Sequence, residues 1–303
     1  MLAGFFEATV RSATPLAFAA LGELIAERSG VINIGLEGTL ACGALASFVA
    51  AQAAGPEAGI LAGGLAGASV ALIFAFFVIT LRAQQIIAGA AVSMLGLGLS
   101  ASLHRVIVAE IGSLPHIATF QVIRVPVLAD FPVIGPALFS QPAPTYALYV
   151  LFPAVSWLLY RTTGGIALRA VGEHPGAAAA TGHSAVTIQF VALLACGFMG
   201  GLGGGALAVA QAGTFSDGMS AGRGFIAIAI VALGRWAPGG VAVGALVFGA
   251  VSSLQFLAQS MGWRVPYTLV LASPYVLTLV AMAAFRGSRV APAALGRPIE
   301  TAL

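Results

Sequence analysis

The sequence predicts an all-α, polytopic transmembrane helical bundle, and three observations support this fold class. The 303-residue chain is 59% hydrophobic and only 8% charged, whereas an ordinary soluble domain is roughly 25% charged. Apolar runs of about 20 residues, long enough to cross a bilayer as a helix, recur along most of the chain with short breaks between them. A transmembrane β-barrel would need alternating segments of about 10 residues, and runs such as Ala58 to Leu81 do not alternate.

About nine candidate spans follow one another in what we interpret as a single transmembrane domain over residues 1–303: near 4–22, 31–54, 57–80, 86–103, 143–160, 186–210, 223–234, 239–259 and 266–285. The seventh span is too short to cross a bilayer alone, so we expect a half-helix or a re-entrant segment. The longest loop, Arg105 to Thr145, contains six prolines. A single regular helix is therefore excluded there.

Glycines recur four residues apart within several predicted spans. The sets are Gly59, Gly63 and Gly67; Gly197, Gly201 and Gly205; and Gly240 with Gly244. Residues four apart lie on one face of a helix, and small residues on that face let membrane helices approach closely. We expect these faces to be packing seams.

The distribution of arginine predicts the orientation of the chain, because basic residues are retained on the cytoplasmic side. Nine spans place most arginines on one side, which we assign to the cytoplasm: Arg28, Arg82, Arg161, Arg169, Arg235, Arg286, Arg289 and Arg297. The N-terminus then lies outside, and 286–303 is a cytoplasmic tail. The remaining arginines fall outside or at the outer interface: Arg11, Arg105, Arg124, Arg223 and Arg264.

Several binding chemistries are excluded by residue types. Every basic residue is arginine and none is lysine, which excludes the Walker A nucleotide loop, because that motif needs a lysine on the phosphates. Cys42 and Cys196 both lie inside apolar runs, where a thiol behaves as a small hydrophobic group. We therefore expect no disulfide, no metal site and no bound cofactor.

Charged and polar residues crowd the window between the first two predicted spans: Glu23, Glu27, Arg28, Asn33 and Glu37. In one interpretation this window is a cytoplasmic hairpin with Glu27 and Arg28 in water. In the other, Ser29 and Gly30 break a helix within the membrane, which is tolerated where the break lines a cavity. Asn33 and Glu37 are then candidates for the translocation pathway, because carboxylates at bilayer depth are costly unless paired or hydrated.

A polar segment, GEHPGAAAATGHS from Gly172 to Ser184, interrupts the apolar sequence. Pro175 suits the first position of a helix, alanine is the best helix former, and Gly182 is a natural terminator. We expect a short helix of two turns or slightly more on the cytoplasmic face. Its surface of alanines is suited to fitting a groove in another protein.

Three stretches, in order along the chain, resemble one family. GELIAERSGVINIGLEGTLACGA (Gly22 to Ala44), RAVGEHPGAAAATGHS (Arg169 to Ser184) and AGRGFIAIAIVALGRWAPGGVAVGALVFG (Ala221 to Gly249) are similar to permeases of ATP-binding-cassette (ABC) importers of the ribose and nucleoside type. The first resembles the signature of the nucleoside branch, and the second resembles the cytoplasmic coupling loop, here residues 161–185. The chain is similar to the shorter of two permease subunits.

The resemblance implies a multi-pass protein of the cell inner membrane that translocates a nucleoside or a related simple sugar and is not itself an enzyme. The implied partners are a cytoplasmic ABC ATPase, usually tandem, a second permease subunit in a heterodimer, and an extracytoplasmic substrate-binding lipoprotein. No nucleic-acid partner is expected. The residues implied to couple to the ATPase are Glu173, His174, Pro175, Ala177, Ala178 and Gly182.

Arg223 and Arg235 flank the short seventh span and resemble family positions. The five-donor guanidinium could close a gate by pairing with a carboxylate or a carbonyl. The simpler interpretation is that both arginines anchor the ends of the helix at the interfaces.

Two other classes of protein share features with this sequence. GMSAG, Gly218 to Gly222, matches the Gly-x-Ser-x-Gly pattern of serine hydrolases, but that motif requires a strand-turn-helix context that an all-helical chain lacks. On composition alone, the main alternative is a secondary transporter driven by an ion gradient. Such a carrier would need neither an ATPase nor a docking loop.

Overall fold

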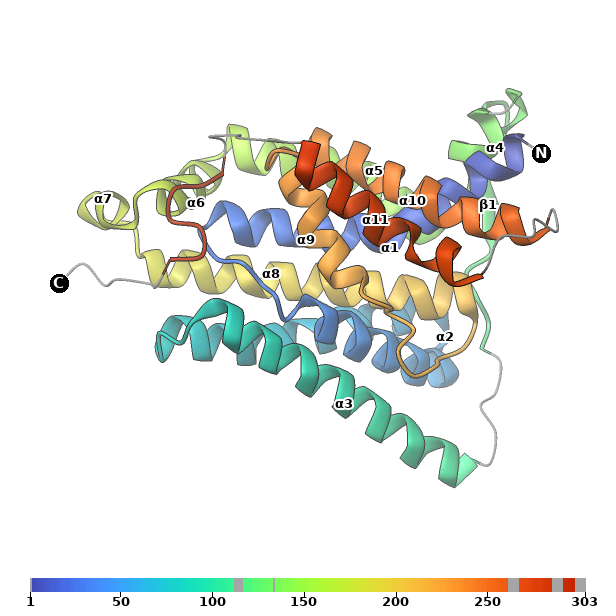
Figure 1. Ribbon diagram of the computed structural model, residues 1–303, viewed down its shortest axis with the longest axis horizontal. Helices are drawn as coiled ribbons and strands as arrows, with labels where there is room; N and C mark the ends of the chain where they lie inside the picture. The colour runs from blue at the N-terminus through green and yellow to red at the C-terminus, as the bar shows by residue number, and fades with distance from the viewer. Residues whose placement is uncertain (1, 112–116, 133, 261–266, 285–290, 298–303) are drawn as a thin grey trace.

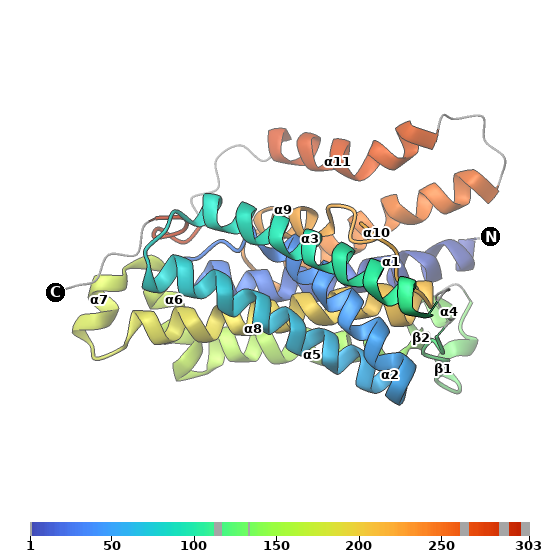
Figure 2. The ribbon, with the colours of Figure 1, turned by 90° about the horizontal axis from the view of Figure 1, so that it is seen from below.

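The computed structural model describes residues 2–111, 117–132, 134–260, 267–284 and 291–297. They form an elongated helical bundle (Figure 1). The N-terminus lies at one end, near α4 and β1, whereas α6 and α7 lie at the opposite end, as the turned view in Figure 2 also shows. We call these the N-terminal end and the α7 end.

The predicted all-α bundle is confirmed for the described residues, apart from one small ribbon of strands. The long helices are α1 (Leu2–Arg28), α2 (Leu36–Ala75), α3 (Gln85–Ile111), α5 (Ala143–Arg161), α8 (Ala185–Gly205), α10 (Pro238–Ser260) and α11 (Tyr267–Ala284). The short helices are α6 (Thr163–Glu173), α7 (Pro175–Ala180) and α9 (Arg223–Leu233). Single π-helical segments extend α2 over Phe76–Thr80 and α8 over Ala206–Ala212.

The proline-rich loop is irregular, as predicted, although α3 continues to Ile111 before the loop begins. It contains β1 (Val122–Arg124), a 3-10 turn (Leu128–Asp130), α4 (Ile134–Phe139) and β2 (Ser140–Pro142). The two strands pair antiparallel. Together these elements cover the N-terminal end of the bundle (Figure 1).

Helix α2 reverses direction at Gly55, where the backbone has φ 85° and ψ 173° and Pro56 follows. Its two halves pack against each other. A Cβ atom on Gly59 would lie 2.7 Å from the Ser47 carbonyl oxygen, and one on Gly63 would lie 2.8 Å from that of Gly43. The separate helices predicted over 31–54 and 57–80 are therefore confirmed, with the first beginning at Leu36.

The glycine seam between α2 and α8 is also confirmed. A Cβ atom on Gly67 would lie 2.7 Å from Gly201 Cα, and one on Gly197 would lie 2.6 Å from the Gly67 carbonyl oxygen. Gly240 behaves differently, because it packs against Gly234 in the turn between α9 and α10. The seam on α8 and the seam on the second half of α2 are thus one shared contact.

Four described segments are long and apolar enough to cross a membrane: Leu36–Thr80, Gln85–Ala109, Ala143–Arg161 and Ala185–Ala212. Two further apolar helices, Arg223–Leu233 and Pro238–Leu254, are shorter. These lengths support a membrane bundle but do not establish the predicted total of about nine spans. The 11 residues of α9 extend about 16 Å, roughly half of the bilayer core, so the seventh predicted span is indeed too short to cross alone.

The core of the bundle surrounds α1. Every residue from Ala13 to Glu27 is buried, and the hydrophobic core around α1 includes side chains of α2, α5, α8, α9 and α10. A helix that is buried on all sides needs apolar or small residues around its whole circumference. The two glutamates in this stretch therefore require specific partners.

Candidate functional site

The connection between α1 and α2 is buried. Helix α1 continues beyond the predicted end at residue 22 and reaches Arg28, and α2 begins at Leu36. Glu23, Glu27, Asn33 and Glu37 are only 0 to 3% exposed. The interpretation that placed Glu27 in water is therefore wrong, and the chain breaks inside the protein instead.

Glu23 fixes the interior of this break. Its Oε1 accepts a hydrogen bond from the Asn33 backbone N–H at 2.8 Å, and its Oε2 accepts one from the Cys196 thiol at 3.2 Å. Asn33 Nδ2 in turn donates to Cys196 Sγ at 3.5 Å. These contacts join α1, the break and α8. Both Cys196 and Cys42 are free thiols.

Glu27 holds the turn between α9 and α10. Trp236 Nε1 donates to Glu27 Oε2 at 2.5 Å, and Arg28 Nε donates to the Trp236 carbonyl oxygen at 2.7 Å. Arg235 and Trp236 both have positive φ angles, 55° and 52°, so this turn is conformationally demanding. Sequence reasoning missed Trp236, because an aromatic residue in an apolar sequence gives no sign of a polar partner.

Glu37 caps the buried N-terminus of α9. Its Oε1 accepts from the Gly222 N–H at 2.8 Å, and its Oε2 accepts from the Gly224 N–H at 2.7 Å. The first N–H groups of a helix lack partners within the helix, and negative charge near this end is favourable. The approach is close, since a Cβ atom on Gly224 would lie 2.5 Å from the Glu37 backbone nitrogen.

Arg223 lies between the two capped amides, at the first position of α9. Its NH1 donates to the carbonyl oxygens of Met219 at 2.8 Å and Ser220 at 3.2 Å, within the loop before the helix. Tyr275 of α11 donates its hydroxyl to the Ala221 carbonyl oxygen at 2.6 Å. A polar junction of α2, α9 and α11 therefore forms at the start of α9, buried at Glu37 and exposed at Tyr275.

The predicted site residues fall into separate groups. Glu37 and Arg223 meet at the α9 N-terminus, whereas Asn33 belongs to the Glu23 and Cys196 cluster. Arg235 is exposed in the turn after α9. Asn33 Oδ1 is buried and has no hydrogen-bond partner among the described residues.

The predicted coupling loop contains two short helices. The spacing predicted one helix within Gly172 to Ser184, but α6 ends at Glu173, and α7 has only six residues. His174 separates them with an extended backbone. Pro175 begins α7 as predicted, and Gly182 follows it with φ 86°, which explains why the helix ends there.

The side chains of this loop are not all directed outward. Glu173, His174, Ala177 and Gly182 are exposed and Pro175 is half-buried, but Ala178 is only 4% exposed. Glu173 does not cap α7, since its Oε2 accepts from the backbone N–H of Ala293 at 3.2 Å. The outward surface of α7 is therefore formed by Ala177 and its neighbours, and Ala178 faces the rest of the chain.

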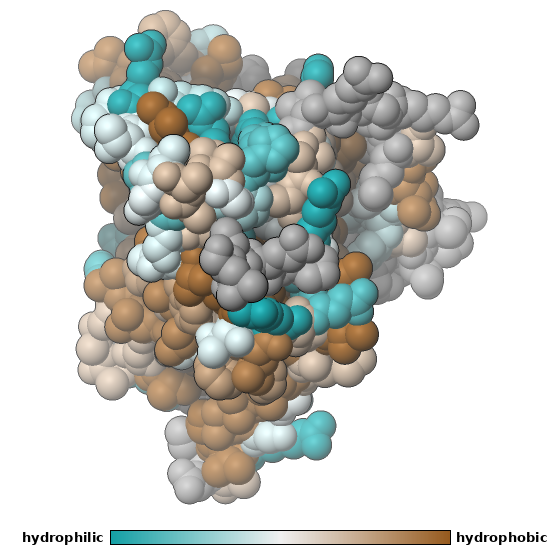
Figure 3. Space-filling view, turned by 90° about the vertical axis from the view of Figure 1, so that its left-hand side faces the viewer, coloured by the Kyte–Doolittle hydropathy of each residue, from teal (hydrophilic) through white to brown (hydrophobic). Residues whose placement is uncertain are grey.

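Seen from the α7 end, hydrophilic residues spread over the upper and central parts of the molecule, and apolar residues cover its lower flank (Figure 3). Arg161 at the end of α5, Arg235 in the turn after α9, and Arg297 are all exposed. A polar end with apolar flanks is the surface expected of a membrane protein where it meets water.

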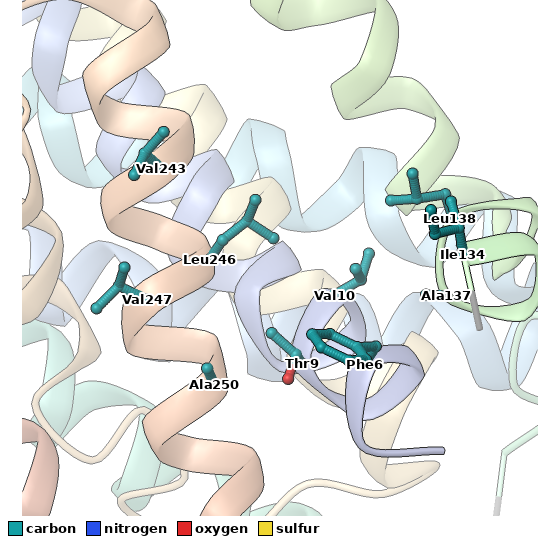
Figure 4. Close-up of a pocket in the computed structure, with 10 residues that line it drawn as sticks. All are labelled: Phe6, Thr9, Val10, Ile134, Ala137, Leu138, Val243, Leu246, Val247 and Ala250. Carbon is teal, nitrogen blue, oxygen red and sulfur yellow. The ribbon is translucent and has the colours of Figure 1, made fainter. Parts of the chain in front are cut away.

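An apolar cavity of about 460 Å³ lies among α1, α4 and α10 (Figure 4). Phe6, Val10 and Leu246 line it, together with other apolar side chains and one threonine, Thr9. Pockets that bind polar ligands carry several placed hydrogen-bonding groups. This cavity is therefore suited to an acyl chain or an apolar side chain rather than to a polar substrate.

A serine hydrolase centre does not form around Ser220. His104 Nδ1 and Asp217 Oδ1 lie 2.5 Å apart, near the loop that contains Ser220. However, neither His104 Nε2 nor Ser220 Oγ has a hydrogen-bond partner within the described part of the chain. Activation of a serine requires a hydrogen bond between nucleophile and base, so this arrangement gives the hydrolase interpretation no support.

Comparison with known proteins connects this architecture to a family. The family described as the permease component of branched-chain amino acid transport systems matches residues 5–283. The guanosine ABC transporter permease protein NupQ of Bacillus subtilis (strain 168) is 37% identical over 303 residues, covering 96% of this chain and 94% of that protein. No solved structure matches the chain significantly.

Two other relatives are of the same kind. The nucleoside ABC transporter permease protein NupC of Lactococcus lactis subsp. cremoris (strain MG1363) is 34% identical, covering 93% of this chain and 92% of that protein. The putative glucose ABC transporter permease protein TsgC13 of Haloferax volcanii is 36% identical, covering 92% of this chain and 85% of that protein.

These matches extend over nearly the whole bundle, including the break after α1, the capped α9 and the α6–α7 loop. Permeases of ABC transporters are transport components rather than enzymes, and they work with a separate ATPase and a binding protein. The chain therefore belongs to the permease family of branched-chain amino acid-type transport systems and is an integral membrane permease subunit of an ABC transporter.

Proposed function

We propose that this subunit belongs to an importer of nucleosides. The observation that carries the proposal is that two relatives named for guanosine and for nucleosides are 37% and 34% identical over more than nine-tenths of the chain. A sugar is the second candidate, because the putative glucose permease is 36% identical. We also propose the specific partners that the family resemblance implies, which are a second permease subunit in a heterodimer, a tandem ATPase and a substrate-binding lipoprotein.

The α6–α7 loop is proposed to contact the ATPase from the cytoplasm. It lies at the end of the bundle opposite to the N-terminus (Figure 1), and its outward residues are small or polar: His174, Ala177 and Gly182. Small side chains allow close insertion into a groove of a partner. Because the chain has no lysine, a Walker A site cannot form within it, and the energy of ATP hydrolysis has to arrive through contact.

The translocation route is proposed to pass the junction of α2, α9 and α11. Broken helices whose N-termini lie inside the membrane are a common way to build substrate sites in transporters. Glu37 is the candidate pathway residue at this junction, and Arg223 is the candidate gate. Asn33, in the neighbouring cluster with Glu23 and Cys196, is the second candidate pathway residue. Arg235, exposed in the turn after α9, is the candidate interface anchor.

Uptake of labelled substrates tests the proposal. A strain that lacks only this gene should lose uptake of radiolabelled guanosine and uridine, and a plasmid copy should restore both. Uptake of labelled glucose and ribose in the same strains tests the sugar alternative. Loss of sugar uptake with normal nucleoside uptake would transfer the assignment to the sugar class.

The energy source separates an ABC importer from an ion-driven carrier. In proteoliposomes that contain the permeases, the ATPase and the binding protein, guanosine uptake should require internal ATP and should persist when a protonophore and a sodium ionophore collapse ion gradients. Uptake without ATP that follows an imposed gradient would contradict the proposal.

A further inference from the structure

The segment 291–297 crosses the α7 end and hydrogen-bonds to α6. The Ala294 N–H donates to the Gly172 carbonyl oxygen at 2.9 Å, and the Ala293 N–H donates to Glu173 Oε2 at 3.2 Å. The contact therefore involves the last turn of α6, immediately before the short helix α7.

The same segment also binds the connection between α1 and α2. The Gly296 N–H donates to the Gly30 carbonyl oxygen at 3.3 Å. The buried side chain of Gln85, at the start of α3, completes the contact, because its Nε2 donates to the Arg297 carbonyl oxygen at 2.9 Å and its Oε1 accepts from the Ile32 N–H at 2.9 Å.

The three partners approach very closely at one point. A Cβ atom on Gly30 would lie 3.5 Å from Ala294 Cβ and 3.5 Å from Gly172 Cα. Gly30 itself has φ 93°, a conformation that favours glycine. A Cβ atom on Gly172 would collide with the Arg28 carbonyl group, so the end of α1, the end of α6 and the segment 291–297 form one packed unit.

The segment has a defined shape of its own. The Leu295 N–H donates to the Pro292 carbonyl oxygen at 3.1 Å, and the Arg297 N–H donates to that of Ala294 at 3.1 Å. These are two overlapping β-turns, and Gly296 has φ 72° in the second. Two consecutive turns therefore define the backbone path of residues 292–297.

We propose that residues 291–297 act as a tie that joins the α6–α7 loop to the α1–α2 break, so that movement of α7 reaches α2 and the α9 N-terminus. Within the described part of the chain, the hydrogen bonds that connect α6 to residues 29–35 run through this segment. Glu37, one residue into α2, carries the movement onward because it holds Gly222 and Gly224. The proposal rests on the proposed contact between α7 and the ATPase.

The test measures whether a nucleotide-driven change reaches α9. A cysteine at exposed Ser216, in the loop before α9, is introduced into a permease in which Cys42 is replaced by alanine and Cys196 by serine. Its labelling rate with an impermeant maleimide is measured in the reconstituted complex, first without nucleotide and then after trapping with ATP and orthovanadate. The two rates should differ when the tie is intact.

Two variants of Gln85 then remove one or both of its hydrogen bonds. Gln85→Met loses both hydrogen bonds, whereas Gln85→Glu keeps an acceptor for Ile32 but loses the donor to Arg297. Both should reduce the nucleotide-dependent change in labelling about fivefold or more, the effect on an equilibrium of losing one hydrogen bond of ordinary strength. Co-purification of the ATPase should stay unchanged.

Two variants of the exposed residue Ala293 show whether an effect comes from a lost hydrogen bond rather than from misfolding. Ala293 occupies the second position of the first turn, where proline is favoured, so Ala293→Pro removes only the N–H donated to Glu173. Ala293→Ser keeps that N–H and is the matched control. Ala293→Pro should reduce the labelling change and Ala293→Ser should not.

Two results would overturn the tie. One is an unchanged nucleotide effect in Gln85→Met, Gln85→Glu and Ala293→Pro, and the other is the absence of any nucleotide effect in the parent. Loss of ATPase co-purification from the parent complex is a separate outcome, which would refute the proposed docking of α7 and with it the tie.

Discussion

At the scale of single residues, the buried glutamates satisfy groups that the fold leaves without partners. Glu37 binds two backbone amides of α9, and Glu23 binds the Asn33 amide in the break. A carboxylate inside a membrane protein is costly unless it is paired or hydrogen-bonded. The charges at Glu23 and Glu37 were therefore visible in the sequence as exceptions that need an explanation.

The identity of the partners was not predictable from the sequence. Gly222 and Gly224 lie 185 and 187 positions along the chain from Glu37. Nearly every residue has a backbone N–H group, so residue type does not reveal which of them binds a carboxylate. Trp236 was likewise missed, because an aromatic residue in an apolar sequence is an ordinary core residue until the fold brings it to Glu27.

Two substitutions of Glu37 should distinguish its role in capping α9 from a general requirement for folding. Glu37→Ala leaves the part-buried Gly222 N–H and the buried Gly224 N–H unpaired, at a cost of about 1–3 kcal/mol for the buried group, and should lower the unfolding temperature of the purified subunit. Glu37→Gln can accept only one of the two hydrogen bonds, so we expect a folded permease with reduced guanosine uptake. Normal uptake and normal stability in both variants would contradict a capping role.

At the scale of secondary-structure elements, glycine spacing predicted helix contacts correctly. The sets on 59–67 and 197–205 pack together because both helices present bare backbone at the same spacing. The pair Gly240 and Gly244 had the same spacing, but Gly240 packs against Gly234 in the turn after α9, and Gly244 packs against Ile230 of α9 itself. Glycine spacing identifies a helix face without side chains, but the segment that packs against this face depends on the fold.

Alanine substitution along this seam gives a sharp test. A methyl group on Gly67 would lie 2.7 Å from Gly201 Cα, so Gly67→Ala should push α2 from α8 and cost about 1–3 kcal/mol of unfolding free energy. Gly98→Ala, in α3, is the matched control, because no heavy atom lies within 4 Å of its added Cβ. Thermal unfolding in detergent should separate the two variants, and equal stability would contradict the seam.

The predicted coupling loop shows where an element-level prediction failed. The positions of Pro175 and Gly182 were interpreted correctly, but α7 is shorter than expected, and Ala178 faces inward. A run of four alanines carries no periodic signal, so the sequence could not distinguish the inner face of the helix from the outer one.

Bulky substitutions on the two faces of α7 should therefore have different effects. Ala177→Trp places the indole on the exposed face, so the permease should fold normally while ATPase co-purification and transport are lost. Ala178→Trp overfills a buried position, at a cost of about 1–3 kcal/mol, and should destabilise the permease itself. Unimpaired ATPase binding by Ala177→Trp would show that this face is not the docking surface.

At the scale of the whole molecule, the composition was sufficient to predict the membrane bundle. Helices α1 and α5 both end with arginine, at Arg28 and Arg161, on the side where α7 lies (Figure 1). What composition could not reveal is the return of residues 291–297 to the end of α6. That contact depends on backbone hydrogen bonds and close glycine packing, which have no sequence pattern of their own.

The orientation of the bundle in the membrane can be tested at these two ends. Ala177 on α7 and Thr119 in the proline-rich loop are both exposed, and their elements lie at opposite ends of the molecule (Figure 2). The excess of arginine at the α7 end predicts that this end faces the cytoplasm.

Single cysteines at the two positions, in a background without Cys42 and Cys196, should thus react from opposite sides. An impermeant maleimide should label Thr119→Cys in intact cells or spheroplasts and Ala177→Cys only in inverted vesicles. Labelling of both from outside, or the reverse pattern, would overturn the orientation and with it the assignment of α7 to the ATPase.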